Sequence, residues 1–163
     1  MSIRFTRVLF GFVLLAAAVA QAKVVYVVPN GAGAKDGTSW GNAFGSIQAA
    51  VTAAGTDAAT ILVRKGDYQL EETVTVGAGS NLEIRGGYTG DGETREGRSN
   101  FLRDATSTTY FRLFSVTAST VAFDGIGFLN GKFNGAVKGI LGLGVCLQTS
   151  CNATFTNCLF KNN

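Results

Sequence analysis

The sequence predicts an all-β domain of short strands that stack in repeated coils. Three observations predict it. Glycine is abundant, with 22 residues against a single proline, Pro29, and Thr, Val, Phe and Ser are frequent. Glycine supplies tight turns, while β-branched and aromatic residues fill pleated, half-buried surfaces. Only one convincing helical pattern occurs, and a 32-residue repeat is visible near the end of the chain.

The first 22 residues have the three zones of a secretory signal peptide. Arg4 and Arg7 give a basic start, residues 8–20 form an unbroken apolar run, and Ala20-Gln21-Ala22 is a small-x-small cleavage site. The alternative, a membrane anchor, is disfavoured because 13 apolar residues are too short to cross a hydrocarbon core of about 30 Å. We expect cleavage between Ala22 and Lys23 and export to the periplasm, the cell surface or the medium.

The residues after the signal, 23–163, have the length of one domain and nearly balanced charge. They hold 12 Lys and Arg against 11 Asp and Glu. This balance gives no electrostatic argument for nucleic acid as a partner. No second long apolar segment follows the signal, so we expect no transmembrane span after cleavage.

The residue types that usually carry catalysis or metal binding are sparse. The chain has no histidine, which removes Ser-His and Cys-His nucleophile pairs and the commonest zinc sites. Cys146 and Cys151 can close a small disulfide loop, which leaves Cys158 unpaired. An intermolecular bond, a buried thiol or a missing partner would each explain the odd count. We predict no catalytic, cofactor-binding or metal-binding residue from the sequence.

The expected elements follow in order along the chain. Residues 23–28 read as a strand, and residues 30–41 as a glycine-rich loop that lacks the Gly-Lys-Ser/Thr ending of a phosphate loop. Ile47–Ala54 has apolar residues at helical spacing, a capping hydroxyl at Ser46 and a stop at Gly55. Gly66-Asp67-Tyr68 reads as a turn and residues 90–98 as a polar loop. Further strands are expected at 61–63, 73–76, 82–87, 110–116, 120–123 and 153–155.

Residues 121–131 and 153–163 form the repeat. The aligned pairs are Phe123 with Phe155, Ile126 with Cys158, Phe128 with Phe160, and Asn130 with Asn162. Stacked coils require such a match because no coil can bury its inner face alone. Cys158 therefore reads first as a core residue, and the phenylalanines as a stacked aromatic core.

The N-terminal motifs resemble those of exported right-handed parallel β-helix proteins of the pectate-lyase-like superfamily. The motifs are Tyr26-Val-Val-Pro-Asn-Gly, Asp36-Gly-Thr-Ser-Trp-Gly-Asn-Ala-Phe, Ile61-Leu-Val-Arg-Lys-Gly-Asp-Tyr and Ile84-Arg-Gly-Gly-Tyr. The resemblance implies that the first strand and the short helix cap one end of the coil. It also makes Trp40 and Tyr88 look structural, although both flank loops where they could meet a glycan.

The last residues resemble the repeat of polymorphic outer-membrane proteins. Phe160-Lys161-Asn162-Asn163 matches its Phe-x-x-Asn step, Phe128-Leu129-Asn130-Gly131 departs by ending in Gly, and Gly135-Ala136-Val137 follows an Asn where a first Gly is usual. The chain stops inside a repeat, so we expect 23–163 to be the N-terminal part of a β-helix domain. Its C-terminal β-helix edge would then be open to self-association.

Three functions are compatible with these patterns. The first is an exported, non-catalytic module for cell-surface adhesion or glycan contact, with a polysaccharide or a host or cell surface as partner. The second is a Ca²⁺-dependent polysaccharide lyase or glycoside hydrolase, for which Asp104 and Asp124 would bind calcium beside Arg103 or Arg112. The third is a truncated fragment with no independent function. The acidic residues of the 90–98 loop alternate with arginines, a pattern typical of a solvated loop rather than a metal site.

Overall fold

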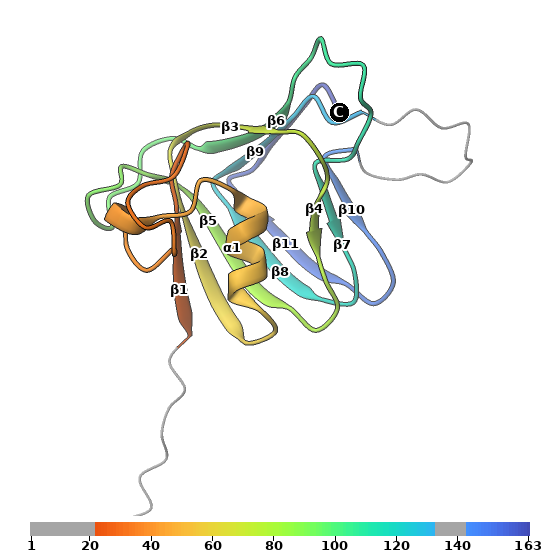
Figure 1. The fold of residues 1–163 in the computed structure, drawn as a ribbon. Helices are drawn as coiled ribbons and strands as arrows, with labels where there is room; N and C mark the ends of the chain where they lie inside the picture. The colour runs from red at the N-terminus through yellow and green to blue at the C-terminus, as the bar shows by residue number, and fades with distance from the viewer. Residues whose placement is uncertain (1–21, 133–142) are drawn as a thin grey trace, which may run out of the picture.

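The computed structural model describes residues 22–132 and 143–163 (Figure 1). The predicted signal peptide, except its last residue Ala22, and the Gly135-Ala136-Val137 step lie outside the described residues. The described chain is an all-β structure with a single α-helix and three sheets, in which neighbouring strands run parallel.

The three sheets are built from strands that alternate along the chain. The first sheet contains, in spatial order, β1 (Lys23–Val27), β2 (Ala58–Arg64), β5 (Asn81–Tyr88), β8 (Thr120–Asp124) and β11 (Asn152–Thr156). The second contains β3 (Gly66–Leu70), β6 (Ser99–Arg103), β9 (Ile126–Leu129) and β12 (Leu159–Lys161). The third contains β4 (Val74–Val76), β7 (Phe114–Val116) and β10 (Val145–Leu147).

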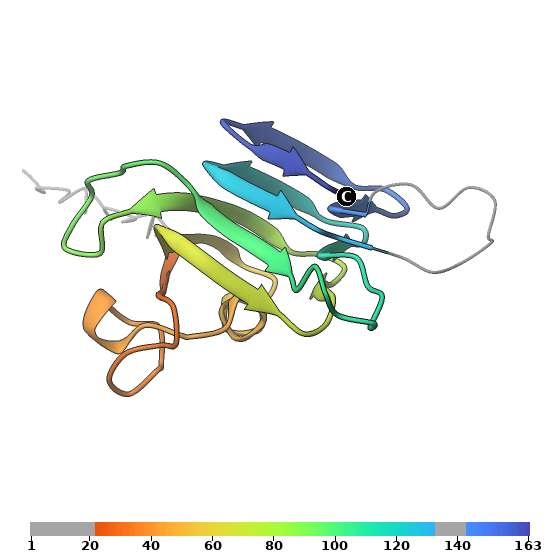
Figure 2. The same cartoon turned by 90° about the horizontal axis from the view of Figure 1, so that it is seen from above.

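The chain visits the three sheets in a fixed order and returns to the first sheet one position further along. We call each such passage a circuit, for example β2, β3, β4 and then back to β5. Figure 1 shows the sheets as three sides around a common interior, and Figure 2 shows the circuits stacked from α1 to the C-terminal strands. The core therefore lies inside the circuits, where the buried apolar side chains of all three sheets meet.

The stacking register places like residues above one another. In the first sheet Ile61 pairs with Ile84, Ile84 with Phe123, and Phe123 with Phe155. In the second sheet Tyr68, Phe101, Phe128 and Phe160 form a second ladder of partners. The predicted 32-residue repeat is confirmed by these pairs, and the Asn162 amide donates to the Asn130 side-chain oxygen at 3.4 Å.

The helix α1 (Ile47–Ala54) has the predicted bounds and closes one end of the stack. Its buried residues Ile47, Ala50, Val51 and Ala54 join the core, and it contacts β1, β2 and β4. The Ser46 hydroxyl accepts a hydrogen bond from the Ala49 amide, and Gly55 ends the helix at a φ of 71°. A single turn of 3₁₀-helix, η1 (Trp40–Asn42), precedes it in the glycine-rich loop.

Several strand predictions need correction. Gly66-Asp67-Tyr68 is not a turn but the start of β3, because the chain turns at the corner before Gly66. The strands β6 and β10 were not predicted, and β9 and β12 were seen only as parts of the repeat. The strand expected at 110–116 begins only at Phe114. These strands have three to five residues and bury few side chains, so their apolar pattern is weak.

Two glycines make the corner between the first and second sheets tight. A Cβ atom on Gly86 would lie 2.5 Å from the Gly125 carbonyl oxygen, and Gly125 itself has a φ of 69°. The backbones of two successive circuits can approach at this corner only because neither residue has a side chain.

Candidate binding site

A cleft opens beside the start of α1 at the capped end of the stack. We call it the α1–β3 cleft; its volume is about 410 Å³, which lies in the usual range for ligand sites. It is lined by three segments that are distant in sequence: Pro29–Asn30, Gly45–Gln48 and Asp67–Val74. The connection from β3 to β4 runs along one wall, and the first turn of α1 forms the other.

The walls of the cleft are held by hydrogen bonds between α1 and the first circuit. The Gln48 side-chain oxygen accepts from the Thr75 amide at 2.7 Å, and its NH₂ group donates to the Thr75 carbonyl at 3.3 Å. Asp67 accepts a hydrogen bond of 2.8 Å from the Asn100 side chain in the next circuit. The first pair of bonds joins α1 to β4, and the last joins β3 to β6.

Tyr68 forms part of the cleft lining and is itself buried. Its hydroxyl donates to the Arg64 carbonyl at 2.7 Å, and burial raises the pKa of Tyr68 well above its ordinary value. The phenol therefore stays neutral at physiological pH. Together with Pro29 and Leu70 it gives the cleft an apolar component.

The charged groups that line the cleft are all acidic. Asp67, Glu71 and Glu72 are exposed, and no Lys or Arg is among the lining residues. The amides of Gln48 and Gln69 add donors and acceptors. In residues 22–132 and 143–163 there is no group of three or more His, Cys, Asp or Glu arranged to hold a metal ion. The cleft is thus suited to a ligand rich in hydroxyl or cationic groups.

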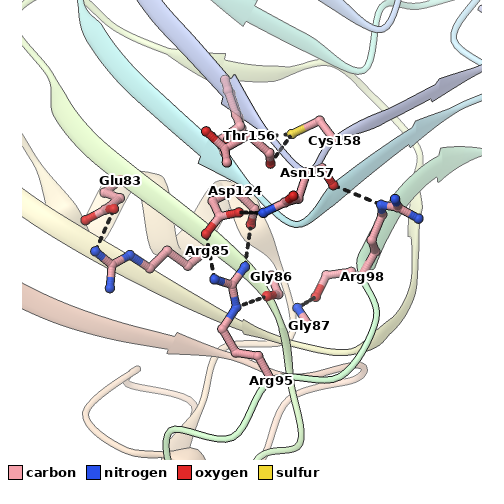
Figure 3. A network of polar contacts seen from close by, with 12 residues as sticks. Glu83, Arg85, Gly86, Gly87, Arg95, Arg98, Asp124, Thr156, Asn157 and Cys158 are labelled. Atoms are coloured by element: carbon pink, nitrogen blue, oxygen red, sulfur yellow. Dashed lines mark hydrogen bonds and ion pairs between the residues drawn. The ribbon is translucent and has the colours of Figure 1, made fainter.

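A second polar cluster, here called the arginine bridge, joins successive circuits at the corner between the first two sheets (Figure 3). Arg95, from the loop after β5, forms an ion pair of 2.5 Å with Asp124 at the end of β8. Its Nε donates to the Gly86 carbonyl at 2.8 Å. Arg98 donates to the Asn157 carbonyl at 2.9 Å, and the Asn157 amide donates to Asp124 at 3.0 Å.

The arginine bridge lowers the pKa of Asp124. The hydrogen bond from Arg95 is the largest cause, and the bond from Asn157 and the positive charges of Arg95 and Arg85 act in the same direction, while burial opposes them. Because its acceptors are used by neighbouring side chains, Asp124 has a structural role here. Arg95 and Arg98 of the 90–98 loop therefore link successive circuits, a role that the local charge pattern does not indicate.

The structure does not bring the residues considered for a lyase together at Asp124. Arg103 is buried and donates to the carbonyls of Asn130, Ser107 and Thr109. Asp104 accepts from the amide and hydroxyl of Thr106, which lowers its pKa. Arg112 lies half-buried just before β7. Asp104 and Asp124 therefore accept hydrogen bonds from different partners.

The aromatic residues Trp40 and Tyr88 are packed within the structure. The Trp40 ring lies 4.9 Å from the Tyr26 ring and 5.6 Å from the Tyr88 ring, measured between centroids. Its indole N–H donates to the Gly92 carbonyl at 3.3 Å, and the Arg95 guanidinium lies over Tyr88. These contacts tie the glycine-rich loop to the 90–98 loop.

The acidic residues of the 90–98 loop do not converge. Glu96 forms an exposed ion pair of 2.7 Å with Lys65, and Asp91 accepts from the Thr89 hydroxyl. Glu93 is exposed. The three acidic side chains of this loop are therefore exposed at separate places on the surface.

All three cysteines are free thiols in the structure, so the predicted Cys146–Cys151 pair is not formed there. Cys151 and Val145 both pack against the core. Cys146 follows Val145 on β10, so its side chain points away from the core, on the opposite face of the strand. Cys158 packs against the core beside Ile126, and burial raises the pKa of its thiol. The core interpretation of Cys158 agrees with this placement, and the disulfide stays a prediction.

Comparisons with family models, with curated proteins and with solved structures find no match to the chain. Within the described residues, no helix is both long enough and apolar enough to cross a membrane.

Proposed function

We propose that the protein is an exported, non-catalytic glycan-binding module, wound as a right-handed parallel β-helix, and that its ligand enters the α1–β3 cleft. The observation that carries the proposal is the cleft itself, where hydroxyl-binding groups from three segments surround an apolar lining.

The winding is supported by the way the chain returns to each sheet. Every strand of the first sheet from β2 onward is separated from the next by one strand in each of the other two sheets, and all pairs are parallel. Connections between parallel strands of one sheet are right-handed in nearly all proteins. Export is supported by the basic start, the apolar run and the small-residue site that end at Ala22.

The lining of the cleft supports a sugar as ligand. A pyranose offers hydroxyls that both donate and accept, and one apolar face of C–H groups. Asp67, Glu71 and Glu72 accept hydrogen bonds, Gln69 can donate and accept, and Leu70 and Pro29 provide apolar contact. Because the carboxylates repel anions, we propose neutral or amino sugars rather than uronates as the preferred class.

Calorimetric titration of residues 23–163 with neutral, amino-sugar and uronate oligosaccharides tests the proposal. We expect binding of the first two classes, weaker binding of uronates, and no effect of a calcium chelator. Glu72→Gln should weaken binding about tenfold because it removes a charged acceptor from the cleft. Glu93→Gln is the matched control, since Glu93 is exposed in the 90–98 loop outside the cleft lining.

Absence of binding by any sugar at millimolar concentration would contradict the proposal, as would equal affinities of the two variants. Release of unsaturated sugar ends in the presence of Ca²⁺ would favour the lyase alternative instead. If Asp124 were the calcium ligand of such a lyase, Glu72→Gln would retain the activity and Asp124→Asn would lose it.

A further inference from the structure

The α1–β3 cleft runs along one edge of β3, which is the terminal strand of the second sheet and pairs only with β6. In each residue pair of a parallel ladder, only one of the two residues bonds to the partner strand. Ser99 of β6 faces the other way, since its amide donates to the Gly125 carbonyl, so its partner Gly66 is the residue that bonds across the pair. The main-chain groups of Asp67 and Gln69, one and three residues further along, therefore point away from β6.

The edge formed by Asp67 and Gln69 is open toward the cleft. Both residues line it, and in the part of the chain that the structure describes no main-chain hydrogen bond reaches them from outside β6. A circuit stacked before β1 does not cover this edge, because that place is taken by the glycine-rich loop. The Tyr26 amide donates to the Gly37 carbonyl at 3.0 Å, and the Phe44 amide donates to the Tyr26 carbonyl at 2.9 Å. Each edge residue thus offers the cleft one donor and one acceptor.

The neighbouring edge of β4, the terminal strand of the third sheet, shows how such groups are satisfied at this end of the stack. The carboxamide of Gln48 occupies that edge, accepting from the Thr75 N–H at 2.7 Å and donating to the Thr75 carbonyl at 3.3 Å. A single amide group, rather than another strand, is the partner of the edge. Among the described residues no side-chain amide takes the corresponding place at β3, so an amide on a ligand can take it.

We infer that the cleft selects N-acetylated amino sugars, with the acetamido group bound at the open edge of β3. This inference rests on the glycan-binding function proposed above. The acetamido oxygen accepts from the Gln69 N–H. Because a secondary amide is trans, its own N–H points the opposite way, toward the α1 wall, where Ser46 supplies a hydroxyl oxygen. The methyl group packs on Pro29 and Leu70 of the lining.

The same contacts disfavour a sugar with a free amino group. An ammonium group only donates hydrogen bonds, so it cannot accept from the Gln69 N–H. Its charge is attracted to Glu71 and Glu72, but both residues are exposed, and water and salt screen the attraction. Acetylation therefore adds an acceptor and an apolar methyl group, while the charge that it removes gains little in this cleft.

Calorimetric titration of residues 23–163 with matched trimers of N-acetylglucosamine, glucosamine and glucose tests the inference at an ionic strength of about 0.15 M. The acetylated trimer should bind about tenfold more tightly than the other two. Equal affinities for the three trimers would overturn this inference and leave the proposed glycan-binding function in place. Absence of binding by all three would overturn both.

Gln69→Pro tests the edge N–H directly. Proline removes that N–H, and an edge strand tolerates proline where the N–H faces away from the partner strand. The variant should lose the preference for the acetylated trimer. Gln69→Ala is the matched control, because it removes the same side chain, keeps the N–H and should keep the preference. Loss of the preference in both variants, or in neither, would overturn the inference.

Hydrogen exchange of the Gln69 amide measures the same contact in the unsubstituted chain, so the test does not depend on the folding of Gln69→Pro. The acetylated trimer should slow this exchange about tenfold, and the glucose trimer should not. An unchanged Gln69 amide would overturn the inference. So would a lysine-rich extended peptide that binds more tightly than the acetylated trimer, because the edge would then be a site for an added strand.

Discussion

Arg95 shows how one loop residue can stabilise the stack. Its side chain contacts the Gly86 carbonyl in its own circuit and the Asp124 carboxylate in the next. Both side chains of the pair are more than two-thirds buried, so solvent screens the interaction less than at an open surface. The 90–98 loop is therefore a connection between circuits as well as a surface feature.

The Asp124→Asn variant should lower the free energy of unfolding by about 1 kcal/mol at pH 7, since the charged hydrogen bond to Arg95 is lost. The pKa of Asp124 is lowered in the folded state, so its carboxylate stabilises the fold above the unfolded pKa of about 3.9. That contribution disappears as the pH falls through the lower, folded pKa. Urea unfolding at pH 7 and near pH 3 should thus show a difference from wild type that shrinks in acid.

Asp57→Asn serves as the comparison for this measurement, because Asp57 is exposed just beyond α1. It should change stability by less than about 0.5 kcal/mol at either pH. A difference for Asp124→Asn that is equal at both pH values would exclude the ion pair as its cause.

At the scale of elements, α1 covers the interior at the capped end. Four of its eight residues are buried, and Gln48 bonds it to the backbone of β4. The same helix forms one wall of the α1–β3 cleft, so its position affects both stability and the candidate site. An isolated helix of eight residues would not be stable in water, and its packing on the core is what maintains it.

Ile47→Ala should lower the free energy of unfolding by about 3 kcal/mol, because it removes a fully buried side chain and leaves a cavity under the helix. Chemical denaturation measures this change, and binding of a hydrophobic dye should report exposure of the capped end. Thr52→Ala, on the exposed face of α1, is the control and should stay within about 0.5 kcal/mol of wild type. Equal losses of unfolding free energy in both variants would mean that the buried face of α1 contributes no more to stability than its exposed face.

The sequence was sufficient for the elements with a strong local signal. The bounds of α1 followed from a helical pattern between Ser46 and Gly55, and the 32-residue repeat alone predicts the register of β8 with β11. The strand β6 was missed because its inward residues include Ser99 and Arg103, which do not mark a buried strand. Arg103 is buried there while it donates hydrogen bonds to the carbonyls of residues 107, 109 and 130, and these partners are not visible in a local pattern.

The candidate site was less predictable than the fold. The α1–β3 cleft combines residues near positions 30, 47 and 70, and no motif joins these segments. The arginine bridge combines residues 29 positions apart, so charges that look solvated in the sequence find partners one circuit away. Both features depend on how the circuits stack, which is a property of the whole molecule.

At the scale of the whole molecule, stability should be graded along the stack. Each circuit contacts only its neighbours, so the protection of a circuit depends on whether both of its faces are covered. The circuits that contain β2 and β5 lie between α1 and later strands, whereas β11 and β12 are covered on one side. The buried Ile84 and the exposed Phe155 lie in the same ladder, and a further circuit covers Ile84 but not Phe155 among the described residues.

Hydrogen exchange should therefore be at least tenfold slower for amides of β2 and β5 than for those of β11 and β12. Uniform exchange across all strands would instead mean that the stack unfolds as one cooperative unit.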